Sequence, residues 1–137
     1  MGLDARVYIN LKRLPAAVDL KRVSVDSQTG EVVADTGQRF IALEKRLGNS
    51  ARVQWLGERV AGALTQIPSS LLITRVLYSG THSGDIIEAA DLPQLQREIQ
   101  MVRENTESDE VEVQRFLTDF EDLLRAAEEQ LNPIVFV

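Results

Sequence analysis

Residues 106–137 read TESDEVEVQRFLTDFEDLLRAAEEQLNPIVFV, and this stretch carries the clearest structural signal in the chain. Its apolar residues recur every three or four positions, which is the period of an amphipathic helix. The stripe consists of Val113, Phe116, Leu117, Phe120, Leu123, Leu124, Ala127 and Leu131. Ser108 can cap the start of this helix. Pro133 ends it, and the apolar residues that follow predict a last strand.

The first part of the chain predicts extended structure. Residues 3–9 alternate apolar and polar side chains, the pattern of a strand with one apolar face. Residues 10–20 contain Pro15 and show no clean period, so we expect a connection there. Residues 21–37 predict a β-hairpin, because DSQTG supplies turn residues and Gly30 can take a positive φ.

The apolar period changes after residue 37. Three apolar residues spaced i, i+3 and i+7 predict a helix that ends at Gly48, and these are Phe40, Leu43 and Leu47. Asn49 or Ser50 can then cap a second helix that runs to about Thr65. The two helices would form a short helical corner.

The middle of the chain predicts a second hairpin followed by a helix. Residues 69–78, SSLLITRVLY, place apolar side chains on both faces of an extended segment, as in a central strand. After a polar loop, residues 85–90 predict the return strand. Asp91 precedes a helix over residues 92–105, and is a plausible cap for it.

Runs of strands and runs of helices in this order are typical of an α+β fold. We expect an antiparallel or mixed sheet of about five or six strands with about four helices packed on it. The chain has 137 residues, of which 44% are hydrophobic, so residues 1–137 are predicted to form a single globular domain.

Composition excludes several kinds of site. The chain has no cysteine, which removes disulfides, thiolate nucleophiles and cysteine metal ligands. With one histidine, and an acidic segment that lacks the spacing of a calcium loop, we expect no metal site and no cofactor. No apolar run approaches the roughly 18 residues of a membrane span, and the first ten residues lack the features of a signal peptide. We therefore expect a cytoplasmic protein that does not bind membranes.

The net charge of −6 is unevenly distributed. Residues 104–129 hold ten acidic and two basic residues, so the rest of the chain carries +2. An acidic total argues against nucleic-acid binding, since phosphate contacts need clustered Lys and Arg. The acidic face of the 108–131 helix could steer a basic protein partner, and a solvated helix face is the ordinary alternative. Glu128 and Glu129 oppose the helix dipole, which favours a partner.

The loop YSGTHSGD, residues 78–85, holds the only histidine, His82. A catalytic interpretation makes His82 a base toward Ser83 or Thr81, with Asp85 orienting the imidazole. The loop lacks the first glycine of a G-x-S-x-G elbow, and neighbours in a tight loop rarely reach the fixed geometry of a relay. A hairpin turn with two glycines for backbone freedom explains the same residues more simply.

A third interpretation of this segment is a binding loop. Backbone amides between the two glycines can hold an anion, and an imidazole is the side chain that most readily changes charge near neutral pH. The binding residues would be Thr81, His82 and Asp85, together with Arg75. Arg75 lies among apolar residues, so a salt-bridged position at a sheet edge is the ordinary alternative.

Four segments, MGLDARVYIN, VDSQTGEVVAD, ALEKRLGN and VLYSGTHSGDII, resemble a group of small bacterial single-domain proteins. The resemblance extends from the N-terminus through the His82 loop, and it implies a bacterial cytosolic protein. The group has no known reaction, so no catalytic residue is implied. A looser likeness to toxin-immunity proteins rests on size, acidity and fold class without a shared motif.

We weigh three functions from the sequence. The preferred one is a non-enzymatic protein-interaction domain, regulatory or immunity-like, with an acidic helix surface. The second is a small hydrolase or transferase that uses the His82 loop. The third is a self-associating structural domain in which residues 133–137, PIVFV, pair edge to edge across a homodimer.

Overall fold

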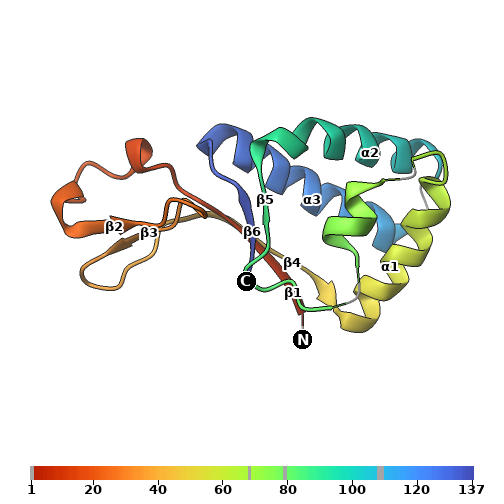
Figure 1. The fold of residues 1–137 in the computed structure, drawn as a ribbon, viewed down its shortest axis with the longest axis horizontal. Helices are drawn as coiled ribbons and strands as arrows, with labels where there is room; N and C mark the ends of the chain where they lie inside the picture. Colours follow the sequence, from red (N-terminus) through yellow and green to blue (C-terminus); the bar gives the residue numbers. More distant parts are fainter. Residues whose placement is uncertain (1, 68, 79, 108–109) are drawn as a thin grey trace.

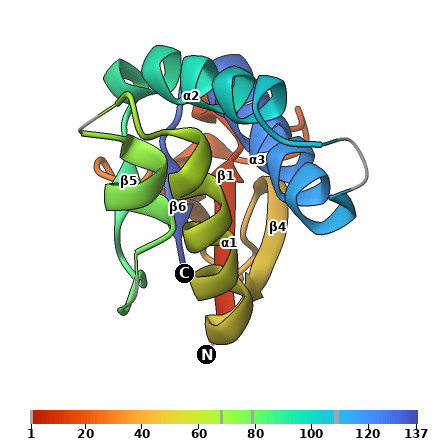
Figure 2. The same ribbon diagram turned by 90° about the vertical axis from the view of Figure 1, so that its right-hand side faces the viewer.

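The computed structural model describes residues 2–67, 69–78, 80–107 and 110–137. Three helices cover one face of a four-stranded antiparallel sheet (Figures 1 and 2). The helices are α1 (Ser50–Ala63), α2 (Leu92–Glu104) and α3 (Val111–Gln130). The strand order is β4-β1-β6-β5, with bounds β1 Gly2–Tyr8, β4 Ile41–Asn49, β5 Ile86–Ile87 and β6 Ile134–Phe136. The predicted α+β class is confirmed.

Strand β1 shows how the sheet meets the helices. Leu3, Ala5 and Val7 alternate with less buried residues, and all three belong to the main core. Full burial of a side chain such as Leu3 or Val7 stabilises the fold by about 1.5–3 kcal/mol. The helices supply most of the remaining core, including Val53, Leu56, Val60, Leu95, Ile99, Val102, Val113, Phe116, Leu117, Phe120, Leu123 and Leu124.

Residues 10–40 project from this body as an arm (Figure 1). The arm contains two one-turn 3-10 helices and a two-stranded hairpin, with bounds Leu11–Arg13, Leu20–Arg22, β2 Val23–Val25 and β3 Val32–Ala34. The predicted hairpin is confirmed, and Gly30 in its turn has a φ of 77°. Val32 and Phe40 are the buried apolar residues of the arm, and neither belongs to the main core.

The helix predicted to end at Gly48 is wrong, because residues 41–49 form strand β4. β4 pairs with β1 from Tyr8 opposite Ile41 to Gly2 opposite Asn49. Exposed and less exposed residues alternate along β4, so its burial follows the two-residue period of a strand. The same segment also satisfies the i, i+3, i+7 spacing of a helix. The partner strand decides between the two periods.

Gly48 takes part in the strand rather than capping a helix. It has a φ of 149° and lies at a register shift, where β1 moves from pairing with Gly48 to pairing with Arg46. Such a bulge favours glycine. Asn49 then caps α1, because its side chain accepts a hydrogen bond from the N–H of Arg52 at 2.9 Å.

The strand predicted over residues 69–78 is also wrong, because Leu72–Val76 forms a turn of π-helix. The cause is Glu98 on α2, whose fully buried carboxylate accepts a hydrogen bond from the Ser70 hydroxyl at 2.5 Å. The same carboxylate accepts the N–H groups of the next two residues at 2.9 and 3.0 Å. A carboxylate from another element therefore caps this turn.

The predicted return strand, residues 85–90, is reduced to β5, which pairs with β6 instead of with the segment before the loop. The His82 loop therefore joins a helical turn to an outer strand and is not a hairpin turn. β6 lies between β1 and β5 and is paired on both sides. The edge-to-edge homodimer contact expected for residues 133–137 does not hold, because that strand has no free edge.

The remaining helix predictions are mostly accurate. α2 begins directly after Asp91, with Pro93 in its first turn. Asp91 makes no capping hydrogen bond and instead pairs with Arg75 at 3.8 Å. The cap proposed at Ser108 lies outside the described residues. Within the described part of the chain, no helix is both long and apolar enough to cross a bilayer.

Candidate functional site

Residues 80–85 of the His82 loop are fastened to the end of β6. The N–H of Gly84 donates to the carbonyl of Phe136 at 2.8 Å, and the N–H of Phe136 donates to the carbonyl of Asp85 at 2.9 Å. Gly80 and Gly84 have φ values of 144° and 91°, the backbone freedom expected of them. The loop is therefore held against the sheet.

His82 packs between two aromatic rings of this region. Its imidazole stacks on Tyr78 with 4.0 Å between ring centroids and meets Phe136 edge-on at 5.6 Å. Its Nε2 atom is buried and has no hydrogen-bond partner among the described residues. A buried polar atom of this kind needs a partner, and the described part of the chain does not supply one.

Asp85 bonds to Tyr78 and not to the imidazole. Its carboxylate accepts a hydrogen bond from the Tyr78 hydroxyl, which also reaches the carbonyl of Thr81 at 3.2 Å. The bond to Asp85 raises the pKa of Tyr78 to about 12, with burial of the phenol adding to the shift. Ser83 is exposed. The relay of His82, Ser83 and Asp85 considered from the sequence is therefore not assembled.

A pocket of about 400 Å³ opens between this loop, the start of β1 and the first turns of α1. The polar side chains that line it come from all three elements and include Asp4, Ser50, Gln54, Thr81, His82 and Ser83. The volume is that of a small-ligand site. Of the predicted binding residues, Thr81 and His82 line the pocket, while Asp85 braces the loop through Tyr78.

Arg75 is not among the residues that line this pocket. Its guanidinium donates to the carbonyl of Ile86 at 2.8 Å and pairs with Asp91 at 3.8 Å. It thus covers the outer strand β5, a salt-bridged position at a sheet edge, although it stands on a helical turn and not on a strand. Guarding an edge in this way limits unwanted strand pairing.

Five carboxylates of the acidic stretch 104–129 form ion pairs with basic residues of other elements. Among the described residues, these pairs join Glu110 to Arg59, Glu112 to Arg52, Asp119 and Asp122 to Lys45, and Glu121 to Arg103. These basic partners stand on α1, β4 and α2, so α3 and Glu110 just before it are linked by ion pairs to three neighbouring elements. Most of the acidic face expected to meet a basic partner is occupied in this way.

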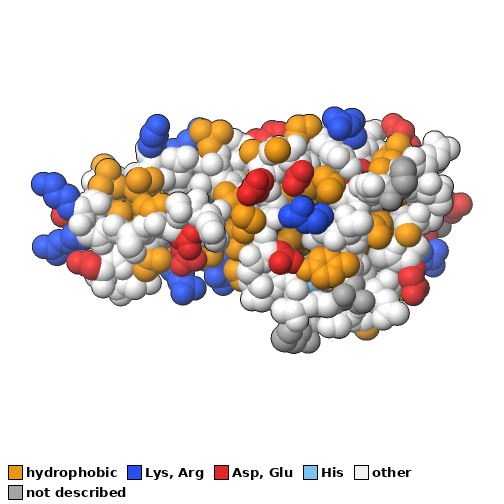
Figure 3. All heavy atoms as spheres, in the orientation of Figure 1, with side chains coloured by type: hydrophobic (Ala, Val, Ile, Leu, Met, Phe, Trp, Pro, Cys, Tyr) orange, Lys and Arg blue, Asp and Glu red, His pale blue; other side chains and the backbone are white. Residues whose placement is uncertain are grey.

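The arm shows the opposite pattern. Its two 3-10 turns share the sequence Leu-Lys-Arg, and each begins at Asn10 or Asp19, whose side chain accepts the lysine N–H at 2.9 or 3.0 Å. Leu11 and Leu20 remain 37% and 58% exposed, and residues 15–17 between the turns are exposed as well. Figure 3 shows hydrophobic side chains on the arm between Lys and Arg side chains at its upper edge and outer end.

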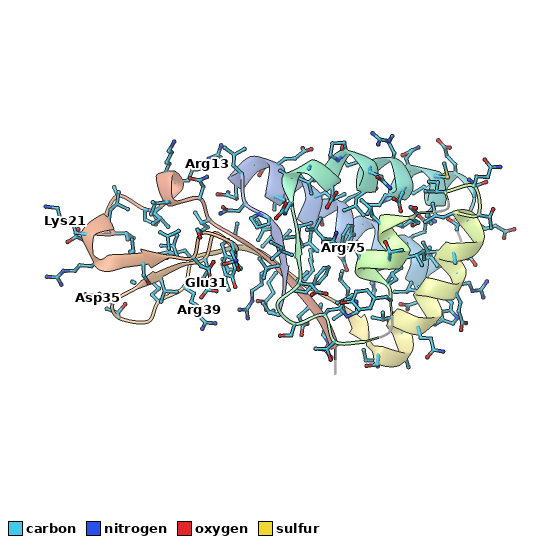
Figure 4. All side chains as sticks on the ribbon, viewed as in Figure 1. Arg13, Lys21, Glu31, Asp35, Arg39 and Arg75 are labelled. Atoms are coloured by element: carbon cyan, nitrogen blue, oxygen red, sulfur yellow. The ribbon has the colours of Figure 1, made fainter. Side chains whose placement is uncertain are left out.

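The cations of these turns are mostly without ion pairs. Lys12, Arg13 and Lys21 pair with none of the described acidic residues, and Arg22 has only long contacts of 3.7 and 3.9 Å to exposed carboxylates. Figure 4 places Arg13 on the side of the arm near α3 and Lys21 at its outer end. The arm therefore presents a surface that is both apolar and cationic.

Two features were missed from the sequence. Glu98 interrupts the apolar stripe of α2 between Leu95 and Ile99, and that position was the signal for a buried carboxylate. The repeated turn is visible as NLKRL and DLKRV, inside and just after the segment predicted to be only a connection.

No group of His, Asp and Glu side chains in the part of the chain that the structure describes could hold a metal ion. No family model, curated protein or solved structure matches the chain. The resemblance to small bacterial proteins stays a prediction.

Proposed function

We propose that the protein is a non-enzymatic protein-interaction domain and that the arm is its binding element. The observation that carries this proposal is the combination of exposed leucines and unpaired cations on residues 10–40, outside the main core. A two-stranded hairpin is marginally stable on its own. Apolar side chains that are exposed together mark interaction surfaces. Covering the arm with another molecule would bury them.

The chemistry of the arm indicates the kind of surface it fits. Leu11 and Leu20 are flanked by Lys12, Arg13 and Lys21, so a complementary surface has apolar groups bordered by carboxylates. The basic partner expected for the acidic helix is less well supported, because most carboxylates of that helix form ion pairs within the chain. A regulatory or immunity-like role is compatible with such a domain.

Capture from the host cell tests this proposal. Tagged wild-type protein is compared with a Leu11→Ser/Leu20→Ser variant, in cells that also make the untagged chain. Both leucines are exposed, so the fold should persist. Val111→Ser, at a position 63% exposed on α3, is the matched control. We expect wild type and control to retain the same partner in fixed proportion and the double variant to lose it. Equal capture by all three, or none by any, contradicts the proposal.

A second candidate function is small-ligand binding in the His82 pocket. The buried, unpartnered Nε2 atom beside a space of about 400 Å³ favours it. Because His82 is the only histidine, its ring protons give a single set of NMR signals. Inorganic phosphate should shift them saturably in wild type and much less in Thr81→Ala; an unsaturable shift would exclude this anion. The hydrolase or transferase alternative is not favoured, because His82, Ser83 and Asp85 do not form a catalytic relay. Equal rates of ester and phosphoester hydrolysis by wild type and by His82→Ala would exclude it.

A further inference from the structure

The first turn of the arm and the last turn of α3 form one surface. Asn10 donates its side-chain amide to the carbonyl of Gln130 at 2.7 Å and its backbone N–H to the side chain of the same residue at 2.9 Å. These bonds place the first Leu-Lys-Arg turn beside the end of α3 (Figure 1). We give the name end patch to the exposed residues within three positions of Asn10 or Gln130, which are Leu11, Lys12, Arg13, Glu128, Glu129 and Leu131.

The end patch carries both signs of charge without internal pairing. Lys12, Arg13 and Glu129 have no ion pair with any described residue, and Glu128 accepts a hydrogen bond from the amide of Gln96 at 2.9 Å. The two glutamates stand at the C-terminal end of α3, where the helix dipole disfavours anions. For Glu129, no hydrogen bond or ion pair with a described residue offsets that cost.

Leu131 adds an independent sign that this surface is used. Its backbone is left-handed, with φ 55° and ψ 35°, at a helix end where glycine or asparagine is usual. Its side chain is 81% exposed. A leucine here is strained by its Cβ and gains little from burial. Strained residues persist where the surroundings or a function require that side chain.

We propose that the end patch is a two-fold contact between two copies of this chain. The inference rests on the proposed function, because it names what covers the arm. A two-fold contact must be self-complementary, and this patch is: Lys12 and Arg13 of one copy face Glu128 and Glu129 of the other. The exposed leucines pack between them. A partner with a single sign of charge would leave half of the patch unmatched.

Sedimentation velocity over a concentration series tests the contact. Wild type should form a concentration-dependent dimer. Lys12→Glu/Arg13→Glu places acids against acids across the axis, and Glu128→Lys/Glu129→Lys places bases against bases. Each variant alone should dimerise about tenfold more weakly or worse. An equimolar mixture of the two variants should recover the dimer, because both halves of the mixed contact then pair opposite charges.

Arg97→Glu/Glu58→Lys is the control, since both positions are exposed and have no ion pair with described residues. It should sediment as wild type does. Far-ultraviolet circular dichroism and melting temperature check that every variant is folded. Wild type that stays monomeric throughout overturns the two-fold contact, while arm-dependent capture of a different protein would still support the proposed function. Charge variants that dimerise like wild type, or a mixture that stays monomeric, also overturn it.

Discussion

The body and the arm use the same residue types for different ends. In the body, the leucines of α3 are buried and its carboxylates pair with bases on α1, β4 and α2. In the arm, Leu11 and Leu20 are exposed, and three cations have no ion pair among the described residues. Leucines and charged side chains therefore contact other parts of the chain in the body, whereas in the arm they remain available for contact with another molecule.

The difference teaches where function can be placed in a small protein. The main core is assembled entirely from residues outside 10–40, so the arm is not needed to bury it. The arm is attached to the body by polar contacts such as the two hydrogen bonds between Asn10 and Gln130. Changes in the arm should thus affect binding more than stability.

The largest difference in the free energy of unfolding is expected between leucine-to-alanine substitutions in the body and in the arm. Leu117→Ala removes a fully buried side chain and should lower the free energy of unfolding by about 3–5 kcal/mol. Leu20→Ala, at an exposed position, should change it by less than about 0.5 kcal/mol. Urea denaturation followed by circular dichroism measures both. A loss above about 2 kcal/mol for Leu20→Ala would show that the arm is part of the folding core.

A smaller loss is expected for the buried carboxylate of α2. Glu98→Gln replaces one acceptor oxygen with an amide donor, which leaves buried donors near Ser70 without a partner. The free energy of unfolding should fall by about 2–3 kcal/mol. Glu104→Gln, at an exposed position on the same helix, is the matched control and should be nearly neutral. Similar losses for both variants would refute the capping role of Glu98.

Leu131→Gly should have an effect of opposite sign on stability and on binding. Glycine relieves the left-handed backbone, so the free energy of unfolding should rise by about 0.5–1 kcal/mol. Loss of the exposed side chain should weaken the dimer. Leu131→Ala separates the two effects, because it removes the side chain and keeps the strain. An unchanged dimer in both variants would remove Leu131 from the contact.

The smallest effect concerns the His82 loop. The pKa of Tyr78 is raised to about 12, chiefly by its hydrogen bond to Asp85, so the stability this bond contributes is present below pH about 10 and is lost as the pH approaches 12. Asp85→Asn should lower the pKa of Tyr78 toward its ordinary value. Ultraviolet titration of tyrosinate measures the change. Tyr8, whose pKa is raised by burial, should titrate as before and serves as the internal control.

The sequence predicted those elements whose signal is local. The apolar stripe of α3 and the turn at Gly30 were identified from spacing and turn chemistry alone. β4 was not, because Phe40, Leu43 and Leu47 satisfy a helical spacing and only pairing with β1 decides for the strand. The π-helical turn at Leu72–Val76 was missed because its cap, Glu98, comes from a distant part of the chain.

The candidate sites divide in the same way. The two loop glycines and the salt-bridged Arg75 follow from residue type and neighbours. The bond between Tyr78 and Asp85, which displaces the expected relay, depends on how the loop folds back on β6. The arm was overlooked because exposure cannot be inferred for apolar residues such as Leu11 and Leu20 without knowing that they lie outside the core.

The most direct test of the arm as the binding element is photo-crosslinking in the host cell. A photoreactive amino acid is placed at Leu20 or at Leu11 on the arm and, for comparison, at Glu58 on the exposed side of α1. We predict that irradiation joins the arm positions to one defined partner, with a mass that includes that of a second copy if the end patch is a two-fold contact, and that position 58 gives no such product. A defined product from position 58 with none from either arm position would contradict the account.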